Sequence, residues 1–409
     1  MPGLNDEGEV SRRSFLKAGV TTAAAAGLPL EAWAAEVPPR QKDPLPRRVL
    51  GRTGEKVSML NLGTAEKISE RLLNAAYDAG IRYFDTADCY TNGASEKVVG
   101  EWMAKTGRRK EFFVVTKDHP KTPDEWVTMV DTRLEVLQTD YIDLFFIHGL
   151  GAGYWGGGDD GARDIPKMKE WSAAVDKMKK SHKVHFVGFS THTKLPLRIE
   201  LLNNAAAGGW VDAIMVAYDP QLVGANAEFN KALDACHKAG VGLICMKEMR
   251  AVAQAPKFMP EFKEMGLTPH QAVLHAVWSD ERISSICSAM SNLKMVEENS
   301  TAARNFKPMD DKKIGAVKRL YERYAVAYCN GCDGRCQKAG GTHAALDDIV
   351  RYLSYYEGDG ERDKARKLYA SLAAEQRRWH GADLAAASAA CVSKLDFASL
   401  LARAQEKLA

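Results

Sequence analysis

Residues 82–90 of the chain have the sequence RYFDTADCY. Its first residues form a short apolar run bounded by polar turn signals, a pattern typical of a buried strand. Asp85 comes at the end of this predicted strand, and Tyr90 follows in the loop. A carboxylate and a phenol can therefore face one cleft. Taken alone, the stretch also fits a strand cap followed by a loop tyrosine.

Two later apolar runs end in a similar way. FFVVTK, residues 112–117, ends on Lys117, and YIDLFFIH, residues 141–148, ends on His148. Parallel α/β barrels keep their chemistry at the carboxyl ends of their strands. Three consecutive predicted strands that end on Asp/Tyr, Lys and His therefore indicate a catalytic site.

Strand and helix patterns alternate from Arg48 onward. Strands are predicted at residues 59–63, 83–86, 112–116, 142–148, 184–190, 213–218, 242–247 and 283–288. Helices are predicted at residues 69–79, 95–105, 124–137, 168–180, 197–206, 227–238, 269–278 and 293–305. Eight such units in sequence predict an α/β protein with a (β/α)8 TIM barrel. The alternative, an open doubly wound sheet, would require a glycine-rich phosphate turn after the first strand, and residues 62–66 (LGTAE) are not one.

Length and charge limit the classes of function. The chain has 409 residues, enough for one large domain and a smaller one. Its net charge is +3 and no basic cluster stands out, so no nucleic-acid partner is expected. A small-molecule substrate is expected instead. The sequence leaves the identity of this substrate and the oligomeric state undecided.

The amino terminus carries a targeting pattern. Residues 11–17, SRRSFLK, precede a mildly apolar run at residues 18–30 that is too short for a stable membrane span, and Ala32-Trp33-Ala34 offers a cleavage site. The order of these features predicts a twin-arginine export signal over residues 1–34, with the twin-arginine translocase as partner and a periplasmic location. A chance arginine pair in a disordered tail is the alternative. Residues 35–47, rich in proline and charge, are predicted to be a linker.

The segments GIRYFDTADCYTNGASEKVVGEWM, VVTK and YIDLFFIHG resemble the aldo/keto reductase family. The resemblance covers roughly residues 48–308, the predicted barrel. It implies a nicotinamide-dependent oxidoreductase that reduces a carbonyl or oxidises an alcohol. Matched residue by residue, the family's catalytic tetrad falls on Asp85, Tyr90, Lys117 and His148.

The chemistry of this tetrad is physically reasonable. A tyrosine with a pKa of about 10 is a weak acid at neutral pH, and a neighbouring cation brings that pKa toward the working range. Lys117 can supply the cation, and Asp85 can hold it in place. Tyr90 is then the general acid in reduction and the base in oxidation, while His148 orients the carbonyl oxygen.

The resemblance also implies a nicotinamide site, although the match is weaker there. It places these residues at the cofactor: Gly63, Thr64, Asp85, Ser190, Ser291, Asn292 and Asn299. Thr191 and Met215 replace an asparagine and a glutamine that usually grip the carboxamide. Ala289 and Met295 stand where cations usually bind a 2′-phosphate, although Lys294 could substitute. NADP is thus the family expectation, with NAD as the alternative.

A long glycine-rich loop follows the strand that carries His148. It covers residues 149–166 and contains Tyr154 and Trp155. A loop in this position could cover a bound substrate. The alternative is a solvated loop with no role.

The chain continues beyond the predicted barrel into a helical segment, residues 309–409, with Cys329, Cys332 and Cys336 in a glycine-rich loop. Three cysteines at this spacing suit a thiolate metal site, and Cys391 can supply a fourth ligand. The segment resembles the ferredoxin-like extension of one branch of the aldo/keto reductases. This resemblance implies one [4Fe–4S] cluster on the four cysteines. Zinc on the same thiolates and two disulfide bonds are the alternatives.

A second function therefore stays open beside the reductase. An exported iron–sulfur protein could transfer electrons, or have no catalytic role, on a reductase barrel that has drifted from its original chemistry. Thr191, Met215 and Ala289 favour this alternative, whereas the intact tetrad favours the reductase.

Overall fold

The computed structural model describes residues 43–151, 161–218, 220, 226–249, 255–256, 258–324, 329, 331–332, 334–357, 362–391, 393 and 395–409. The chain divides into two compact units, residues 1–41 and residues 42–409. The predicted signal peptide and most of the predicted linker lie outside the described residues, as do Tyr154 and Trp155 of the predicted lid.

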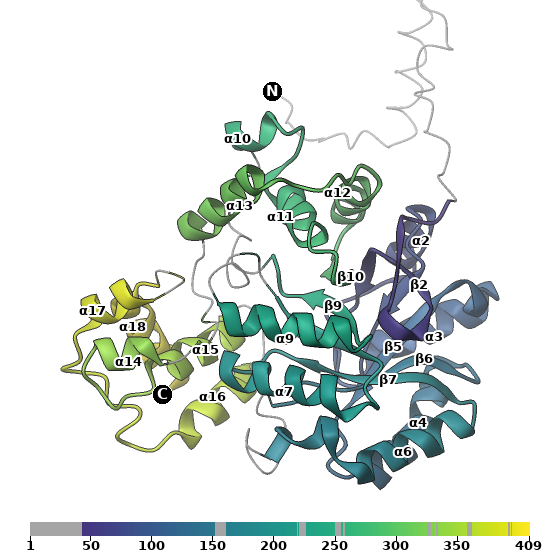
Figure 1. The fold of residues 1–409 in the computed structure, drawn as a ribbon, viewed down its shortest axis with the longest axis horizontal. Helices are drawn as coiled ribbons and strands as arrows, with labels where there is room; N and C mark the ends of the chain where they lie inside the picture. The colour runs from purple at the N-terminus through teal and green to yellow at the C-terminus, as the bar shows by residue number, and fades with distance from the viewer. Residues whose placement is uncertain are drawn as a thin grey trace, which may run out of the picture. The chain divides into compact units, whose positions relative to one another are not determined.

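Among the described residues, eight parallel strands close into a barrel in the order β10-β3-β4-β5-β6-β7-β8-β9 (Figure 1). The strands are β3 (Leu60–Gly63), β4 (Tyr83–Asp85), β5 (Phe113–Asp118), β6 (Ile142–Ile147), β7 (Val184–Thr191), β8 (Ala213–Ala217), β9 (Gly242–Met246) and β10 (Ile283–Ala289). Each overlaps a strand predicted from the sequence. The parallel pairing of β10 with β3 completes the ring. The predicted TIM-barrel fold is therefore confirmed.

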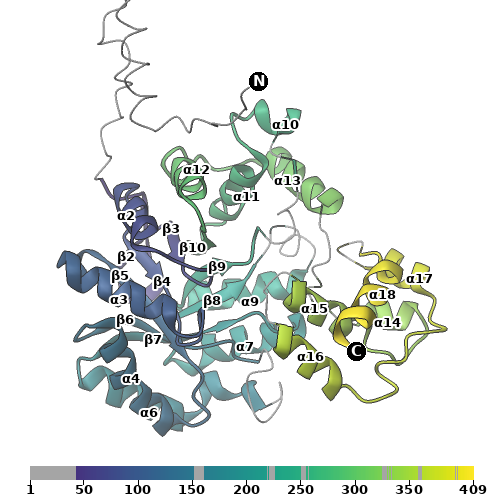
Figure 2. The same ribbon diagram turned by 180° about the vertical axis from the view of Figure 1, so that it is seen from behind.

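Helices alternate with these strands and lie outside the barrel (Figures 1 and 2). They are α2 (Glu70–Asp78), α3 (Ala94–Thr106), α4 (Pro123–Leu137), α6 (Lys169–Lys180), α7 (Leu195–Gly208), α9 (Ala227–Lys238), α11 (Pro269–Trp278) and α12 (Leu293–Arg304). Local sequence fixes several starts, because the side chains of Ser69, Thr122 and Asn226 accept hydrogen bonds from first-turn amides. Thr268 and Gln271 form a capping box on α11. Short helices lie at η3 (Arg109–Glu111), η4 (Ile165–Lys167) and α10 (Pro260–Lys263).

An antiparallel hairpin closes the amino-terminal end of the barrel, and the sequence reasoning missed it. Its parts are β1 (Arg47–Val49), η2 (Gly51–Thr53) and β2 (Lys56–Ser58). The Arg48 guanidinium donates to the carbonyl oxygens of Trp278 at 2.6 Å and Ile283 at 2.8 Å, at the start of β10. Leu50 and Val57 pack into the barrel interior. The hairpin leaves the carboxyl ends of the strands available for a site.

The barrel interior is a packed core. Its members are apolar side chains from alternating strand positions, Tyr83, Val115, Leu144, Phe146, Ala213, Met215 and Ile244. Burying a large apolar side chain contributes about 1.5–3 kcal/mol, so this core stabilises the closed sheet. Gly188 on β7 has no room for a side chain, because a Cβ there would overlap the carbonyl oxygen of Ala213 on β8.

The segment after the barrel is helical, with two separate packing regions. The helices are α13 (Asp311–Tyr324), α14 (Arg335–Ala339), α15 (Leu346–Glu357), α16 (Arg362–Ser371), α17 (Leu384–Ala390) and α18 (Phe397–Leu408). Val317, Leu320 and Tyr321 of α13 pack with residues of α10 and α11. The later helices, drawn from green to yellow in Figure 2, build a core of their own. This second core contains Cys329, Cys336 and Cys391.

The cysteine loop of this segment contacts the loop that follows β7. The backbone amide of Leu195 donates to the carbonyl oxygen of Gly331 at 2.7 Å. The Lys194 ammonium lies 2.7 Å from an Asp348 carboxylate oxygen and 3.3 Å from one of Asp347. The helical tail is thus attached at the same end of the barrel as the predicted site.

Candidate active site

The four predicted tetrad residues lie at the carboxyl ends of three neighbouring strands. Asp85 is the last residue of β4, Lys117 lies near the end of β5, and His148 directly follows β6. Tyr90 lies in the loop between β4 and α3. The pairings of β4 with β5 and of β5 with β6 bring these side chains to one edge of the barrel.

Lys117 is the centre of this group and is fully buried. Its ammonium donates to Asp85 Oδ1 at 2.6 Å and to the carbonyl oxygen of Thr86 at 2.8 Å. It also donates to the Tyr90 hydroxyl at 3.2 Å. A buried cation needs such partners, because leaving it unpaired in the interior would be costly. The same cation favours the phenolate of Tyr90.

Asp85 balances the charge of Lys117. Burial raises the pKa of this carboxyl group, whereas the charge and hydrogen bond of Lys117 act in the opposite direction. The short contact between the two groups favours the ionised pair. Asp85 therefore holds the Lys117 ammonium in place.

His148 lies edge-on to the ring of Tyr90, with ring centroids 5.5 Å apart. Burial lowers its pKa to about 3, although the neighbouring Asp88 carboxylate opposes the shift. The imidazole is therefore neutral near pH 7 and can donate one hydrogen bond to an oxygen held beside Tyr90.

A cavity of about 620 Å³ opens beside Tyr90. Of the predicted cofactor residues, Gly63, Asp85, Asn292 and Asn299 line it. Among the described residues, Thr64, Ser190 and Ser291 lie outside this lining. Ser190 is buried, and its Oγ accepts a hydrogen bond from the Gly149 amide at 2.9 Å.

The lining also shows what replaces the expected cofactor contacts. Met215 stands in the lining where a glutamine was expected, and Ala289 and Met295 line the far part together with Lys294. The Asn292 side chain caps α12 by accepting from the Met295 amide at 3.0 Å. One amide of this helix start is thus taken by the Asn292 side chain, and helix starts in general suit a phosphate through amides that have no intrahelical partner.

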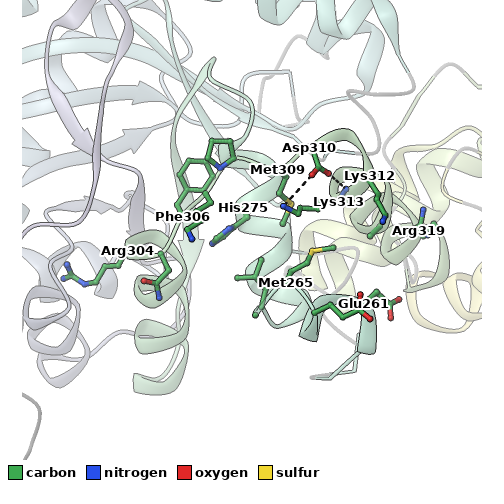
Figure 3. Close-up of a pocket in the computed structure, with 17 residues that line it drawn as sticks. Glu261, Met265, His275, Arg304, Phe306, Met309, Asp310, Lys312, Lys313 and Arg319 are labelled. Atoms are coloured by element: carbon green, nitrogen blue, oxygen red, sulfur yellow. Dashed lines mark hydrogen bonds and ion pairs between the residues drawn. The ribbon is translucent and has the colours of Figure 1, made fainter.

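A larger cavity of about 890 Å³ lies elsewhere, between α10, α11, α13 and the segment after α12 (Figure 3). Its lining includes His275, Arg304, Phe306, Asp310 and Lys313. No tetrad residue lies in this lining, which the structure describes throughout. Size alone therefore does not identify the reaction site.

Sequence reasoning missed two groups beside the tetrad. Asp88, Cys89 and His119 surround His148, and Glu248 lies in the cavity wall. Asp88 and Cys89 belong to the opening motif, and His119 follows the strand that carries Lys117. All of these residues lie just after the end of a predicted strand, and this position is the signal by which the sequence could have identified them.

Glu248 is a buried acid whose pKa burial raises to about 7. The thiol of Cys245 lies 3.7 Å from its Oε2. The folded protein therefore keeps a proton on Glu248 to higher pH than the unfolded chain, in which the pKa is near 4.5. Between these values the folded state binds more protons, so this group lowers the free energy of unfolding as pH rises toward 7.

We expect Glu248→Gln to remove this pH-dependent loss of stability. The variant should unfold at the same denaturant concentration as the parent near pH 4 and be more stable near pH 8, by about 1–3 kcal/mol. Urea unfolding at both pH values measures the difference. Glu264→Gln, at an exposed position, is the control. A variant that loses stability equally at both pH values would contradict the expectation.

Comparisons with known proteins identify two segments of the chain. The aldo/keto reductase family model matches residues 59–255, and the model of the twin-arginine translocation signal matches residues 9–29. The chain is 28% identical over 194 residues to an aldo-keto reductase of Schizosaccharomyces pombe named with NADP(+), covering 44% of this chain and 52% of that protein. It is 26% identical over 319 residues to L-galactose dehydrogenase of Arabidopsis thaliana, covering 67% of this chain and 94% of that one.

Solved structures show the same fold at low identity. An aldo-keto reductase from Bacillus halodurans in its holo form is 20% identical, with a TM-score of 0.53, covering 68% of this chain and 96% of its own. One from Klebsiella pneumoniae, solved with NADPH, is 21% identical with a TM-score of 0.53, covering 68% of this chain and 95% of its own. These likenesses support the barrel fold. The family model covers strands β3 to β9 of this barrel. The chain therefore contains an aldo/keto reductase family domain, matched over residues 59–255.

Proposed function

We propose that this protein is a nicotinamide-dependent oxidoreductase that reduces a small carbonyl compound or oxidises the corresponding alcohol. The observation that carries the proposal is the contact of the Lys117 ammonium with both Asp85, at 2.6 Å, and the Tyr90 hydroxyl, at 3.2 Å. A buried lysine with a purely structural role rarely donates to both a carboxylate and a phenol at the rim of a cavity. Perturbed ionisable groups in a cleft are typical of catalytic sites.

The reaction assigns one role to each member of the tetrad. A bound nicotinamide supplies or accepts the hydride at the substrate carbon. Tyr90 gives its hydroxyl proton to the carbonyl oxygen during reduction and takes it back during oxidation. Lys117 stabilises the phenolate that Tyr90 becomes, and Asp85 keeps Lys117 charged. Neutral His148 donates a hydrogen bond that orients the oxygen.

The cavity supports NADP(H) as the cofactor. Gly63 and Asp85 line the cavity beside Tyr90 and would hold the nicotinamide end, and the start of α12 would hold the phosphates. Lys294 is the cation in the lining that could meet a 2′-phosphate. The NADP(+) in the name of the yeast relative and the NADPH in the Klebsiella structure favour the same cofactor.

The tail is proposed to hold one [4Fe–4S] cluster on Cys329, Cys332, Cys336 and Cys391. Three of these cysteines are buried in one apolar core, and the Gly331 amide donates to Cys329 Sγ at 3.3 Å, a kind of hydrogen bond that tunes cluster thiolates. Within the described part of the chain, ligand atoms at single-ion spacing occur around Asp88 and not at these thiols.

Export to the periplasm completes the proposal. The match to the twin-arginine signal at residues 9–29 supports it. This route carries folded proteins, which suits a chain with a cluster in place. In the part of the chain that the structure describes, no helix is both long and apolar enough to cross a bilayer.

The proposed activity can be tested on the mature protein. We expect oxidation of NADPH, followed by its absorbance, in the presence of small aldehydes or ketones. Cofactor deuterated at the transferred position should slow the single-turnover reaction, because the hydride moves in that step. A protein that binds NADPH yet reduces no carbonyl in a broad panel, with no alcohol oxidation in reverse, would overturn the proposal.

A further inference from the structure

We propose that Asp88, Cys89, His119 and His148 form a binding site for one transition-metal ion of the zinc class. Each residue offers one ligand atom, and these atoms all lie within 4.8 Å of one another. The site adjoins the tetrad and shares His148 with it. The binding of the ion does not depend on the proposed function, although its effect on His148 does.

The barrel topology assembles the four ligands from three successive strand ends. Asp88 and Cys89 lie in the loop after β4, His119 follows β5, and His148 follows β6. The backbone amide of Asp88 donates to the carbonyl oxygen of Lys117 at 3.1 Å, which fixes this loop against β5. All four ligands therefore lie just beyond strand ends of the barrel, and this hydrogen bond restrains the loop that carries two of them.

The spacing of the ligand atoms suits a tetrahedral ion. His119 Nδ1 lies 3.3 Å from Asp88 Oδ2, Cys89 Sγ lies 3.6 Å from His148 Nδ1, and His148 Nδ1 lies 3.8 Å from Asp88 Oδ1. Bonds of about 2.0–2.3 Å to a tetrahedral Zn²⁺ place neighbouring ligand atoms about 3.3–3.8 Å apart. The three distances fall in this range, although the two from Asp88 involve its two different oxygens. Because all four ligand atoms lie within 4.8 Å of one another, an inward movement of the side chains would close the set around one ion.

The ligand chemistry selects the class of metal. Two imidazoles, a thiolate and a carboxylate suit Zn²⁺ and similar ions, whereas Mg²⁺ and Ca²⁺ prefer oxygen ligands throughout. Asp88 and an ionised Cys89 together balance a charge of 2+. Cys89 is exposed and Asp88 half-buried, so an ion can reach them from solvent.

Other charges around the site are already paired. Lys117 is bound to Asp85 at 2.6 Å, and Arg133 contacts Glu96 at 2.8 Å and Asp118 at 3.4 Å. These pairs limit the repulsion that the two cations would exert on a metal ion.

Metal binding would affect the tetrad through one atom. An ion on Nδ1 of His148 leaves the hydrogen of the neutral ring on Nε2 and fixes the orientation of the ring. The metal would therefore act as a positioning group for the hydrogen bond that His148 gives to the substrate oxygen.

The site can be tested by thiol protection, in which the reactivity of Cys89 is measured separately from that of the tail cysteines. The mature protein is treated with iodoacetamide with and without Zn²⁺, and alkylation of the peptide that contains Cys89 is followed by mass spectrometry. We expect Zn²⁺ to slow this alkylation by about tenfold or more, since a metal-bound thiolate is a poorer nucleophile. Co²⁺ should also give a thiolate-to-cobalt charge-transfer absorption.

Matched variants separate a built site from unspecific binding. His119→Asn should abolish both the protection and the cobalt band, and Cys89→Ser should abolish the band. His237→Asn, an exposed histidine on α9, should change neither. Equal alkylation rates with and without Zn²⁺, or protection that persists in His119→Asn, would overturn the proposal.

Discussion

Tyr90→Phe is expected to lower the rate of carbonyl reduction by about a hundredfold or more, because a positioned general acid typically contributes that much. The substitution removes one hydroxyl and keeps the ring that packs edge-on against His148. Lys117 keeps its bonds to Asp85 and Thr86, so the buried cation remains paired. The fold and the affinity for the nicotinamide should therefore change little.

The measurement is steady-state and single-turnover reduction, with NADPH affinity determined on the same preparation by fluorescence. Tyr141→Phe is a matched control, since Tyr141 lies at the amino-terminal side of β6, stacked on His185, away from the cavity. We expect the control to reduce substrate at the parent rate. Near-normal turnover by Tyr90→Phe would remove this tyrosine from the mechanism.

Cys391→Ser is expected to abolish the proposed cluster and loosen the tail, while the barrel keeps its reductase activity. A nicotinamide transfers two electrons as a hydride, whereas a [4Fe–4S] cluster passes single electrons, and a flavin normally stands between such partners. The sequence shows no separate flavin domain. The cluster is therefore expected to fasten the tail rather than to exchange electrons with the site.

The expected loss of stability follows from the length of chain that the cluster closes. Helices α15, α16 and α17 lie between Cys336 and Cys391. Closing so long a loop stabilises a fold by several kcal/mol, roughly 3–5 by the chain-entropy argument for cross-links. The apolar core of the tail remains, so partial rather than complete unfolding is expected.

Iron content, limited proteolysis of the tail and NADPH-dependent reduction should be measured on one preparation. Cys236→Ser provides a control, because this buried barrel thiol donates to the Leu202 carbonyl oxygen at 3.2 Å and a serine can do the same. The structural role is wrong if iron and activity disappear together while the barrel stays folded with nicotinamide bound. Electron transfer through the cluster would then be the better account.

The tail contacts the barrel close to Ser190, one of the predicted cofactor residues. Leu195 and Lys194 follow β7, the strand that carries Ser190 near its end, and they contact Gly331, Asp347 and Asp348 of the tail. A loosened tail could therefore disturb cofactor binding through this loop. Measuring NADPH affinity alongside turnover distinguishes that indirect effect from a redox role.

The sequence by itself determined the barrel and the positions of the tetrad within it. Buried strands read as apolar runs, and helices as amphipathic repeats with capping residues at their starts, so both signals are local. Asp85, Lys117 and His148 could be placed because each ends such a run. In a parallel barrel all strand ends of one kind meet at one edge, so topology alone predicts that these side chains gather.

Only the tertiary structure decided the features that depend on register and on packing between distant segments. The hairpin of β1 and β2 is too short to show a period, and it is stabilised by contacts between Arg48 and the start of β10. Glu248 owes its raised pKa to burial, which no local pattern reports. Asp88, Cys89 and His119 converge on His148 because the β4 loop folds back over the end of β5, and a one-residue shift in strand register would separate them.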